Sequence, residues 1–197
     1  MRRFTLLIIA LLGLTACAAE TKWAPDADVA AAHVTTSNPP TLTLITVINT
    51  ESGNGGHSAL IVDASERVLF DPAGSFYHPR LPERNDVIYG MTDPAVNFFI
   101  DFHSRESWRV VRQDLVVPAA VAQKALALVQ SNGAVPKAFC AGSISDILAQ
   151  LPGFEGMNST MFPVNLMEQF AEHPGVVTRE YHDMDQDNNG QKVARGI

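Results

Sequence analysis

The sequence has few cysteines, few basic residues and no long apolar run. Its 197 residues include two cysteines, and 14 Lys and Arg stand against 21 Asp and Glu. This acidic balance argues against a nucleic-acid partner and against a basic patch that binds a membrane surface. A helix that spans a bilayer needs about 20 predominantly apolar residues, and no stretch reaches that length. The sequence therefore predicts no membrane-spanning helix.

The N-terminus has the layout of an export signal. Arg2 and Arg3 precede an uncharged apolar run over 6–12, which is too short to span a bilayer. The four residues at 14–17, Leu-Thr-Ala-Cys, resemble a lipobox, the cleavage and acylation signal of bacterial lipoproteins. An ordinary secretory signal with a chance cysteine is the alternative. Charge order, run length and cysteine position together favour the lipobox.

The lipobox resemblance implies where the chain works. Residues 1–16 would be cleaved, and several acyl chains on Cys17 would anchor the protein firmly in a membrane. In that family, Ala rather than Asp at position 18 goes with the outer membrane, facing the periplasm. The mature chain of 181 residues, with 12 basic and 21 acidic residues, suits one domain. Its expected partners are the membrane, through the lipid, and peptidoglycan.

Cys140 would then be a lone free thiol in an oxidising compartment. With Cys17 consumed by lipid, no disulfide can form within the chain. A lone thiol in such a compartment is open to oxidation and mispairing. Cys140 is either a small buried core residue or a nucleophile, and composition alone does not decide between them.

Hydrophobic periodicity predicts a single α+β domain over 41–181. The composition of 17–40, rich in Ala, Thr, Asp and Pro, predicts a flexible lipidated tether, and 182–197 is predicted to be an acidic polar tail. Residues 75–90 are predicted to form a long irregular loop. The patterns predict strands at 41–49, 58–63, 67–70, 108–117 and 176–181, and helices at 93–103, 118–130, 139–151 and 163–170.

Two short motifs contain residues that can perform chemistry. His57 follows Gly55 and Gly56 and opens a predicted strand, while Cys140 lies near the first turn of a predicted helix, among small residues. Unpaired amides at a helix N-terminus stabilise a thiolate and lower its pKa. The amide of such a residue can also help to bind an oxyanion. A histidine on a neighbouring strand can take the thiol proton and later protonate a leaving group.

In this order, 83 positions apart, the two motifs resemble the circularly permuted NlpC/P60 branch of the papain-like cysteine hydrolases. The resemblance covers about residues 41–152. It implies a permuted papain-like core, in which a small antiparallel sheet packs against helices. It also implies Cys140 as the nucleophile, His57 as general base and acid, and a polar residue after the next strand that orients the imidazole. Asp71 is the candidate for that role, and His78 is a weaker one.

Several assignments stay open. Asp71 begins the stretch Asp-Pro-Ala-Gly, which is also a good turn sequence, so it can orient the imidazole, form a turn or do both. A side chain that binds the oxyanion would come from Asn49, Asn54 or a neighbour. His103, at the end of a predicted helix, is expected to interact with the helix dipole.

Two further motifs are weaker. Residues 185–190, Asp-Gln-Asp-Asn-Asn-Gly, begin like an EF-hand calcium loop. The twelfth position of that loop would be Gly196, which has no carboxylate, so an acidic tail is the preferred interpretation. Ser143 and Ser145 do not form a Gly-x-Ser-x-Gly elbow, which disfavours a serine hydrolase. The sequence therefore predicts no cofactor and no metal.

The predicted function is a lipid-anchored thiol hydrolase of the cell envelope, which cleaves an amide bond through a thioester on Cys140. By analogy with the family, the bond would lie in peptidoglycan stem peptides, and the tether at 17–40 would give reach toward the wall. One alternative is an acyltransferase or lipid thioesterase of the same fold, which an apolar groove beside Cys140 would favour. The other is a non-catalytic envelope-binding lipoprotein, in which Cys140 is a core residue.

Overall fold

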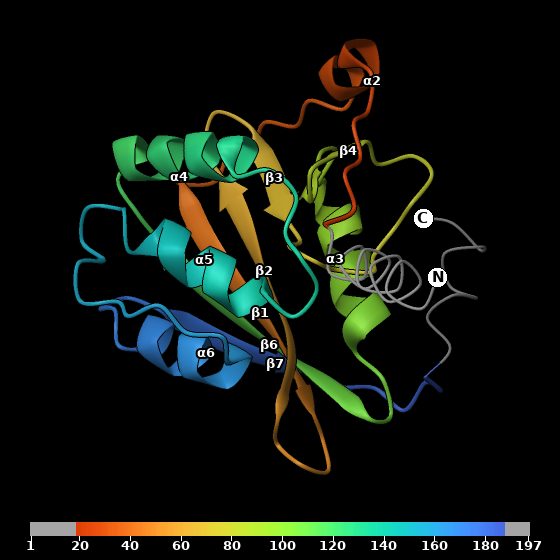
Figure 1. Cartoon of the computed structure of the whole chain (residues 1–197), viewed down its shortest axis with the longest axis vertical. Helices are drawn as coiled ribbons and strands as arrows, with labels where there is room; N and C mark the ends of the chain where they lie inside the picture. Colours follow the sequence, from red (N-terminus) through yellow and green to blue (C-terminus); the bar gives the residue numbers. More distant parts are fainter. Residues whose placement is uncertain (1–18, 188–197) are drawn as a thin grey trace, which may run out of the picture.

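The computed structural model describes residues 19–187 and shows a mixed α+β fold (Figure 1). Its seven-stranded antiparallel sheet has the order β4-β5-β3-β2-β1-β6-β7. The strands are β1 (Thr41–Asn49), β2 (Gly55–Asp63), β3 (Arg67–Phe70), β4 (Glu83–Arg84), β5 (Val87–Ile88), β6 (Trp108–Val116) and β7 (Val177–Tyr181). The helices among the described residues are α2 (Asp26–Ala31), α3 (Asp93–His103), α4 (Ala119–Ser131), α5 (Cys140–Leu148) and α6 (Pro163–Ala171).

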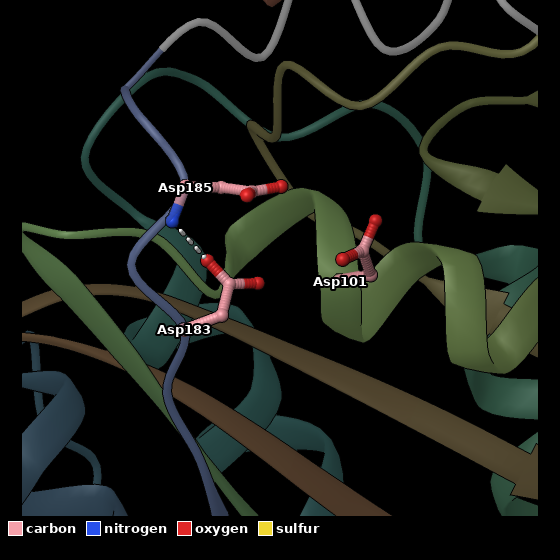
Figure 2. Close-up of side chains that lie close together, drawn as sticks. All are labelled: Asp101, Asp183 and Asp185. Carbon is pink, nitrogen blue, oxygen red and sulfur yellow. Dashed lines mark hydrogen bonds between the residues drawn. The ribbon is translucent and has the colours of Figure 1, made fainter.

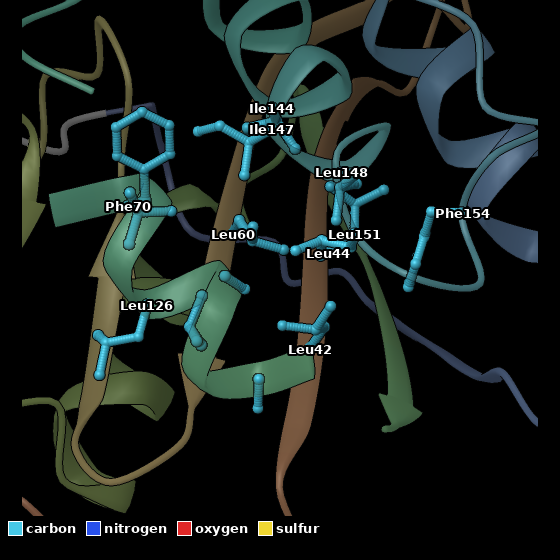
Figure 3. Close-up of a cluster of buried hydrophobic side chains, with 14 of the residues drawn as sticks. Leu42, Leu44, Leu60, Phe70, Leu126, Ile144, Ile147, Leu148, Leu151 and Phe154 are labelled. Carbon is cyan, nitrogen blue, oxygen red and sulfur yellow. The ribbon is translucent and has the colours of Figure 1, made fainter. Parts of the chain in front are cut away.

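The central strands bury apolar side chains on both faces of the sheet. In β1, Leu42 and Leu44 belong to one core cluster, whereas Ile45 and Val47 belong to the other. Helices α4, α5 and α6 cover the first face and α3 covers the second. Figure 3 shows the first cluster, in which Leu126 of α4 lies with leucines of the sheet and of α5. Because helices cover both faces, β1 is buried along almost its whole length, from Leu42 to Ile48.

The four predicted helices are confirmed, and the predicted strands lie close to their expected bounds. α3 begins after Thr92, whose hydroxyl accepts the Ala95 N–H, and a proline lies in its first turn. α5 begins at Cys140 and ends at Leu148, three residues before its predicted end. β2 is longer than predicted, because Gly55 already pairs with β1.

Residues 75–90, which were expected to be irregular, contain the short strands β4 and β5. β5 continues the sheet beyond β3 through the pairs Leu69–Ile88 and Phe70–Val87. β4 then pairs with β5 at the sheet edge. Strands of two residues are too short to show the alternation by which strands are recognised in a sequence.

Residues 19–40 differ from the flexible tether that their composition predicts. This segment contains α2, and its side chains bond to the domain. Val29 and Ala32 pack against the first core cluster, but the bonds are polar, so the absence of a hydrophobic period gave no sign of them. Four side-chain pairs hold the segment: Lys22 with Glu83 at 3.0 Å, Asp26 with Arg84, His33 with Glu66 at 3.0 Å and Thr36 with Asp63 at 2.9 Å.

No helix within residues 19–187 has the length and apolar character needed to cross a membrane. The predicted signal peptide, 1–16, and the predicted lipidation site, Cys17, lie outside the described residues, as do residues 188–197. The first part of the C-terminal segment bonds to the domain, since the Glu106 N–H donates to the carbonyl of Asp185.

Candidate active site

A bulge in β2 positions His57 near the beginning of that strand. His57 pairs with β1, but the next pair along joins Ile48 with Gly55, so Gly56 is an extra residue in β2. Bulges of this kind redirect the neighbouring side chain. A Cβ on Gly56 would lie 2.5 Å from the Trp108 ring, so the close approach of this ring requires glycine.

Asp71 reaches His57 because β3 is shorter than β2. The pairing of the two strands stops at Leu60 and Phe70, and Asp71 follows directly. Asp71 is buried, and its Oδ1 accepts a hydrogen bond from His57 Nε2 at 2.6 Å. Beyond Leu60, the edge of β2 is free of β3, which leaves room for the start of α5.

Cys140 is the first residue of α5 and meets β2 at this free edge. Its sulfur lies beside the His57 side chain and the backbone N–H groups of Ser58 and Ala141, and hydrogen bonding from all three lowers the pKa of the thiol. Since Nε2 of His57 faces Asp71, Nδ1 is the nitrogen left for the sulfur. The structure thus brings together the three residues that the sequence identified as candidates.

These contacts shift the pKa values of the pair in opposite directions. Burial lowers the pKa of His57, but the charge and hydrogen bond of Asp71, together with those of Cys140, outweigh burial and raise this pKa to about 10. Burial raises the pKa of Cys140, but the hydrogen bond and charge of His57, with two backbone amides, bring it below the ordinary value of 9.0. A thiolate–imidazolium pair is therefore stable between the two pKa values.

A donor for an oxyanion is available in the backbone of α5. The Cys140 N–H lies in the first turn, where helical amides have no carbonyl partner within the helix. Asn49, one of the two side-chain candidates, instead holds the loop after β1, because its amide donates to Ser107 O and its Oδ1 accepts from Ser52 N–H. Asn54 is exposed in the same loop. The structure favours the Cys140 N–H over Asn49.

His103 is a neighbour of the pair that no sequence motif revealed. Its ring stacks on the His57 ring, with centroids 5.9 Å apart and planes inclined by 17°. Its Nδ1–H donates to Phe99 O at 2.9 Å. Burial, with the charge of His57, lowers the pKa of His103 to about 4, although Asp71 opposes the shift. His103 therefore bonds to the end of α3 as a neutral ring, not as the cation expected for a helix dipole.

A cavity of about 260 Å³ opens beside the two stacked imidazole rings. Two larger hollows lie elsewhere. In one, of about 570 Å³, charged side chains pair with each other, as Arg67 does with Asp63. The other, of about 810 Å³, lies between α2 and the segment 77–83 and is partly lined by His78, whose Nδ1 accepts the Arg80 N–H. The smallest of these three cavities is thus the one lined by His57 and His103, whereas His78 lines a different hollow.

Asp86 connects the two halves of the site. Its backbone carbonyl accepts the Asp71 N–H at 2.8 Å, and its carboxylate accepts the Val135 N–H at 2.7 Å. Val135 lies in the connection that leads into α5 and Cys140. One residue therefore holds both the strand end that carries the orienting carboxylate and the chain that carries the thiol.

Three carboxylates, from Asp101, Asp183 and Asp185, lie together with ligand atoms within 4.8 Å of one another (Figure 2). The fully buried guanidinium of Arg105 lies 3.6 Å from Asp183 and 3.9 Å from Asp101. This cation offsets the charge of the carboxylates, so the cluster has a structural explanation. The motif at 185–190, for which an acidic tail is the preferred interpretation, shares Asp185 with the cluster, and its part at 188–190 lies outside the described residues.

The coupled pair predicts how Cys140 titrates. In the mature chain with Cys17→Ser, which leaves one thiol, the thiolate should form with a midpoint below pH 9.0. His57→Ala should raise the midpoint, because burial of the sulfur is then less opposed. The ultraviolet absorbance of the thiolate measures this, with His33→Ala as a control at an exposed histidine. An unchanged midpoint in His57→Ala contradicts the pairing.

A second prediction concerns the space that Gly74 leaves for Asp71. A Cβ on Gly74 would lie 1.9 Å from Asp71 Oδ2, so Gly74→Ala should push the carboxylate away from His57. The pKa of His57 should then fall and that of Cys140 should rise, again followed by thiolate absorbance. Gly156→Ala is the matched control, because a Cβ there meets no atom within 4 Å. If both variants titrate like the parent chain, Asp71 does not tune the pair.

A third prediction concerns the stabilising role of Asp86. Asp86→Ala should lower the free energy of unfolding by about 1–3 kcal/mol, because the buried Val135 N–H loses its acceptor. Asp86→Asn keeps an acceptor oxygen and should cost less. Urea denaturation measures both, with Asp146→Ala on the exposed side of α5 as the control. If Asp86→Ala and the parent chain had the same free energy of unfolding, the hydrogen bond between Asp86 and Val135 would contribute nothing to stability.

No protein-family model, no curated protein and no solved structure matches this chain. What the structure establishes is a mixed α+β fold with a seven-stranded antiparallel sheet, and the contacts among His57, Asp71 and Cys140. The likeness to permuted papain-like hydrolases remains a resemblance, carried by the order and spacing of two motifs.

Proposed function

We propose that this protein is a thiol hydrolase of the cell envelope, which transfers an acyl group to water through a thioester on Cys140. The observation that carries the proposal is the 2.6 Å hydrogen bond between Asp71 and His57, with the Cys140 sulfur beside the same imidazole at the first turn of α5. A cysteine that only fills the core has no use for a lowered pKa or for an imidazole held by a carboxylate. This argues against the non-catalytic alternative.

In the first half of the reaction, the Cys140 thiolate attacks a carbonyl carbon. A C–S bond forms, and the carbonyl electron pair moves to oxygen, where the Cys140 N–H can donate to it. The His57 Nδ1–H then gives its proton to the leaving nitrogen or oxygen as that bond breaks. The products are a thioester and a free amine or alcohol, and His57 is left neutral.

In the second half, neutral His57 takes a proton from water, and the resulting hydroxide attacks the thioester. The C–S bond breaks, Cys140 leaves as a thiolate and the acid product departs. Asp71 holds the ring through Nε2 in both halves, so Nδ1 faces the reacting atoms each time. The resting ion pair is restored without any other reactant.

The substrate is less closely defined than the reaction. An amide in a peptidoglycan stem was favoured by family analogy and by a flexible tether that gave reach from the membrane. Because polar pairs hold residues 22–36 on the domain, that reach is lost as an argument. Exposed apolar side chains near Cys140 instead support the alternative, an enzyme that acts on acylated amphiphiles.

The proposal predicts an acyl-enzyme. Mature protein with Cys17→Ser, mixed with an activated acetyl ester and quenched in acid, should gain the mass of one acetyl group. Peptide mapping should place this group on Cys140. Cys140→Ala should gain nothing, and His57→Ala should acylate about 10²–10⁴-fold more slowly. His173→Ala serves as the control for loss of a histidine outside the site.

Failure would also be clear. The proposed chemistry would be excluded if Cys140→Ala were acylated, on other residues, as fast as the parent chain. It would also be excluded if His57→Ala were acylated as fast as the parent chain.

A further inference from the structure

The described chain enters the domain beside the candidate active site. Ala19 and Lys22 share a small hollow of about 60 Å³ with Gly74 and Lys137. Gly74 also lines the cavity beside the stacked histidines, and Lys137 precedes Cys140 by three residues. In Figure 1, the red start of the described chain lies near the connection from α4 to α5.

This entry point limits where a lipid on Cys17 can be. The chain spans at most about 3.5 Å per residue, so two residues of chain reach at most about 7 Å from Ala19. The chain that follows is held on the domain at Lys22. The Lys22 side chain is bonded to Glu83, and the Lys22 carbonyl accepts the Asn85 N–H at 3.0 Å. A bilayer that holds the lipid must therefore lie against this edge of the domain.

Large apolar side chains are exposed around the first turns of α5 and α6. Phe139, just before α5, is 50% exposed, and Phe162, just before α6, is 73% exposed. Met161 is 42% exposed and contacts the first turn of α5, since its sulfur lies 2.9 Å from the place of a Cβ on Gly142. Lys137 is exposed beside them. Apolar residues gathered on a surface mark an interaction site.

We propose that these four residues, Lys137, Phe139, Met161 and Phe162, form a membrane-facing rim that docks on the bilayer holding the Cys17 lipid. The active-site opening then lies at the level of the headgroups. The substrate is an amphiphile of that membrane, which presents an ester or amide bond at its surface. This inference rests on the proposed thiol chemistry and on lipid attached to Cys17, and it assigns the substrate class.

Hydrogen exchange tests the docking without reference to activity. The mature lipidated chain on phosphatidylethanolamine–phosphatidylglycerol vesicles is compared with the mature Cys17→Ser chain in buffer. Amides in 136–140 and 159–163 should exchange more slowly on vesicles, because the rim is covered. The loop 151–156, at the other end of α5, should exchange at the same rate in both and is the internal control.

Two results would overturn the docking. Equal exchange in the rim segments would show that the bilayer lies elsewhere. Protection that grows with protein concentration in buffer, without vesicles, would assign the rim to a second copy of the chain.

A pair of substrates then tests the substrate class. The lipidated enzyme is given a water-soluble acetyl ester and, separately, a long-chain ester amphiphile embedded in the vesicles. Phe162→Ser should leave the rate on the soluble ester within about twofold of the parent. It should lower the rate on the vesicle-embedded ester about tenfold or more, because a phenylalanine side chain buried in the membrane contributes at least a tenfold factor to binding. Val116→Ser, an exposed apolar residue on β6, should change neither rate.

The outcomes separate the two proposals. Hydrolysis of the soluble ester with an unchanged vesicle rate in Phe162→Ser removes the membrane-facing rim and keeps the thiol hydrolase. If the rim is protected on vesicles but neither ester is hydrolysed in a Cys140-dependent way, the proposals of a thiol hydrolase and of its substrate class are wrong. The proposed membrane docking would then still stand.

Discussion

The rest of the site depends on the hydrogen bond between His57 Nε2 and Asp71. It decides which imidazole nitrogen faces Cys140, and it supplies the negative charge that keeps the ring cationic at neutral pH. The fold makes this bond possible by ending β3 one residue before Asp71, next to a length of β2 that β3 does not pair. Gly74 then leaves room for the carboxylate, and Asp86 bonds to the backbone that carries it.

The parts of this arrangement that depend on local patterns could be predicted from the sequence. Alternating apolar residues located the strands around His57 and Asp71, and helical spacing located the helix of Cys140. Two neighbours were missed, because their partners lie far along the chain. His103 stacks on His57 from α3, and the Asp86 carboxylate bonds to an amide 49 positions away. No local periodicity encodes such contacts, and neither residue belongs to a motif.

The N-terminal segment shows the same limit with a larger consequence for function. Residues 22–36 have no apolar period, so composition predicts a free chain, whereas ion pairs and backbone bonds hold it on the domain. A single exposed ion pair contributes about 0–1 kcal/mol, so the segment is held by several bonds together rather than by one. A held segment gives no reach, and it fixes the edge of the domain at which the described chain begins. Its packing therefore bears on the substrate, although it contributes no catalytic group.

The charges of the site also explain how a second histidine can lie so close to it. A thiolate, an imidazolium and a carboxylate carry one net negative charge, which burial disfavours unless hydrogen bonds satisfy it. Two backbone amides donate to the sulfur of Cys140. A cationic His103 would compete for Asp71 and repel the proton on His57, but its pKa of about 4 keeps it neutral while the pair exists. Its ring can thus shield one face of His57 without weakening the thiolate. The working pH range is bounded by Cys140 on the acid side and by His57 on the basic side.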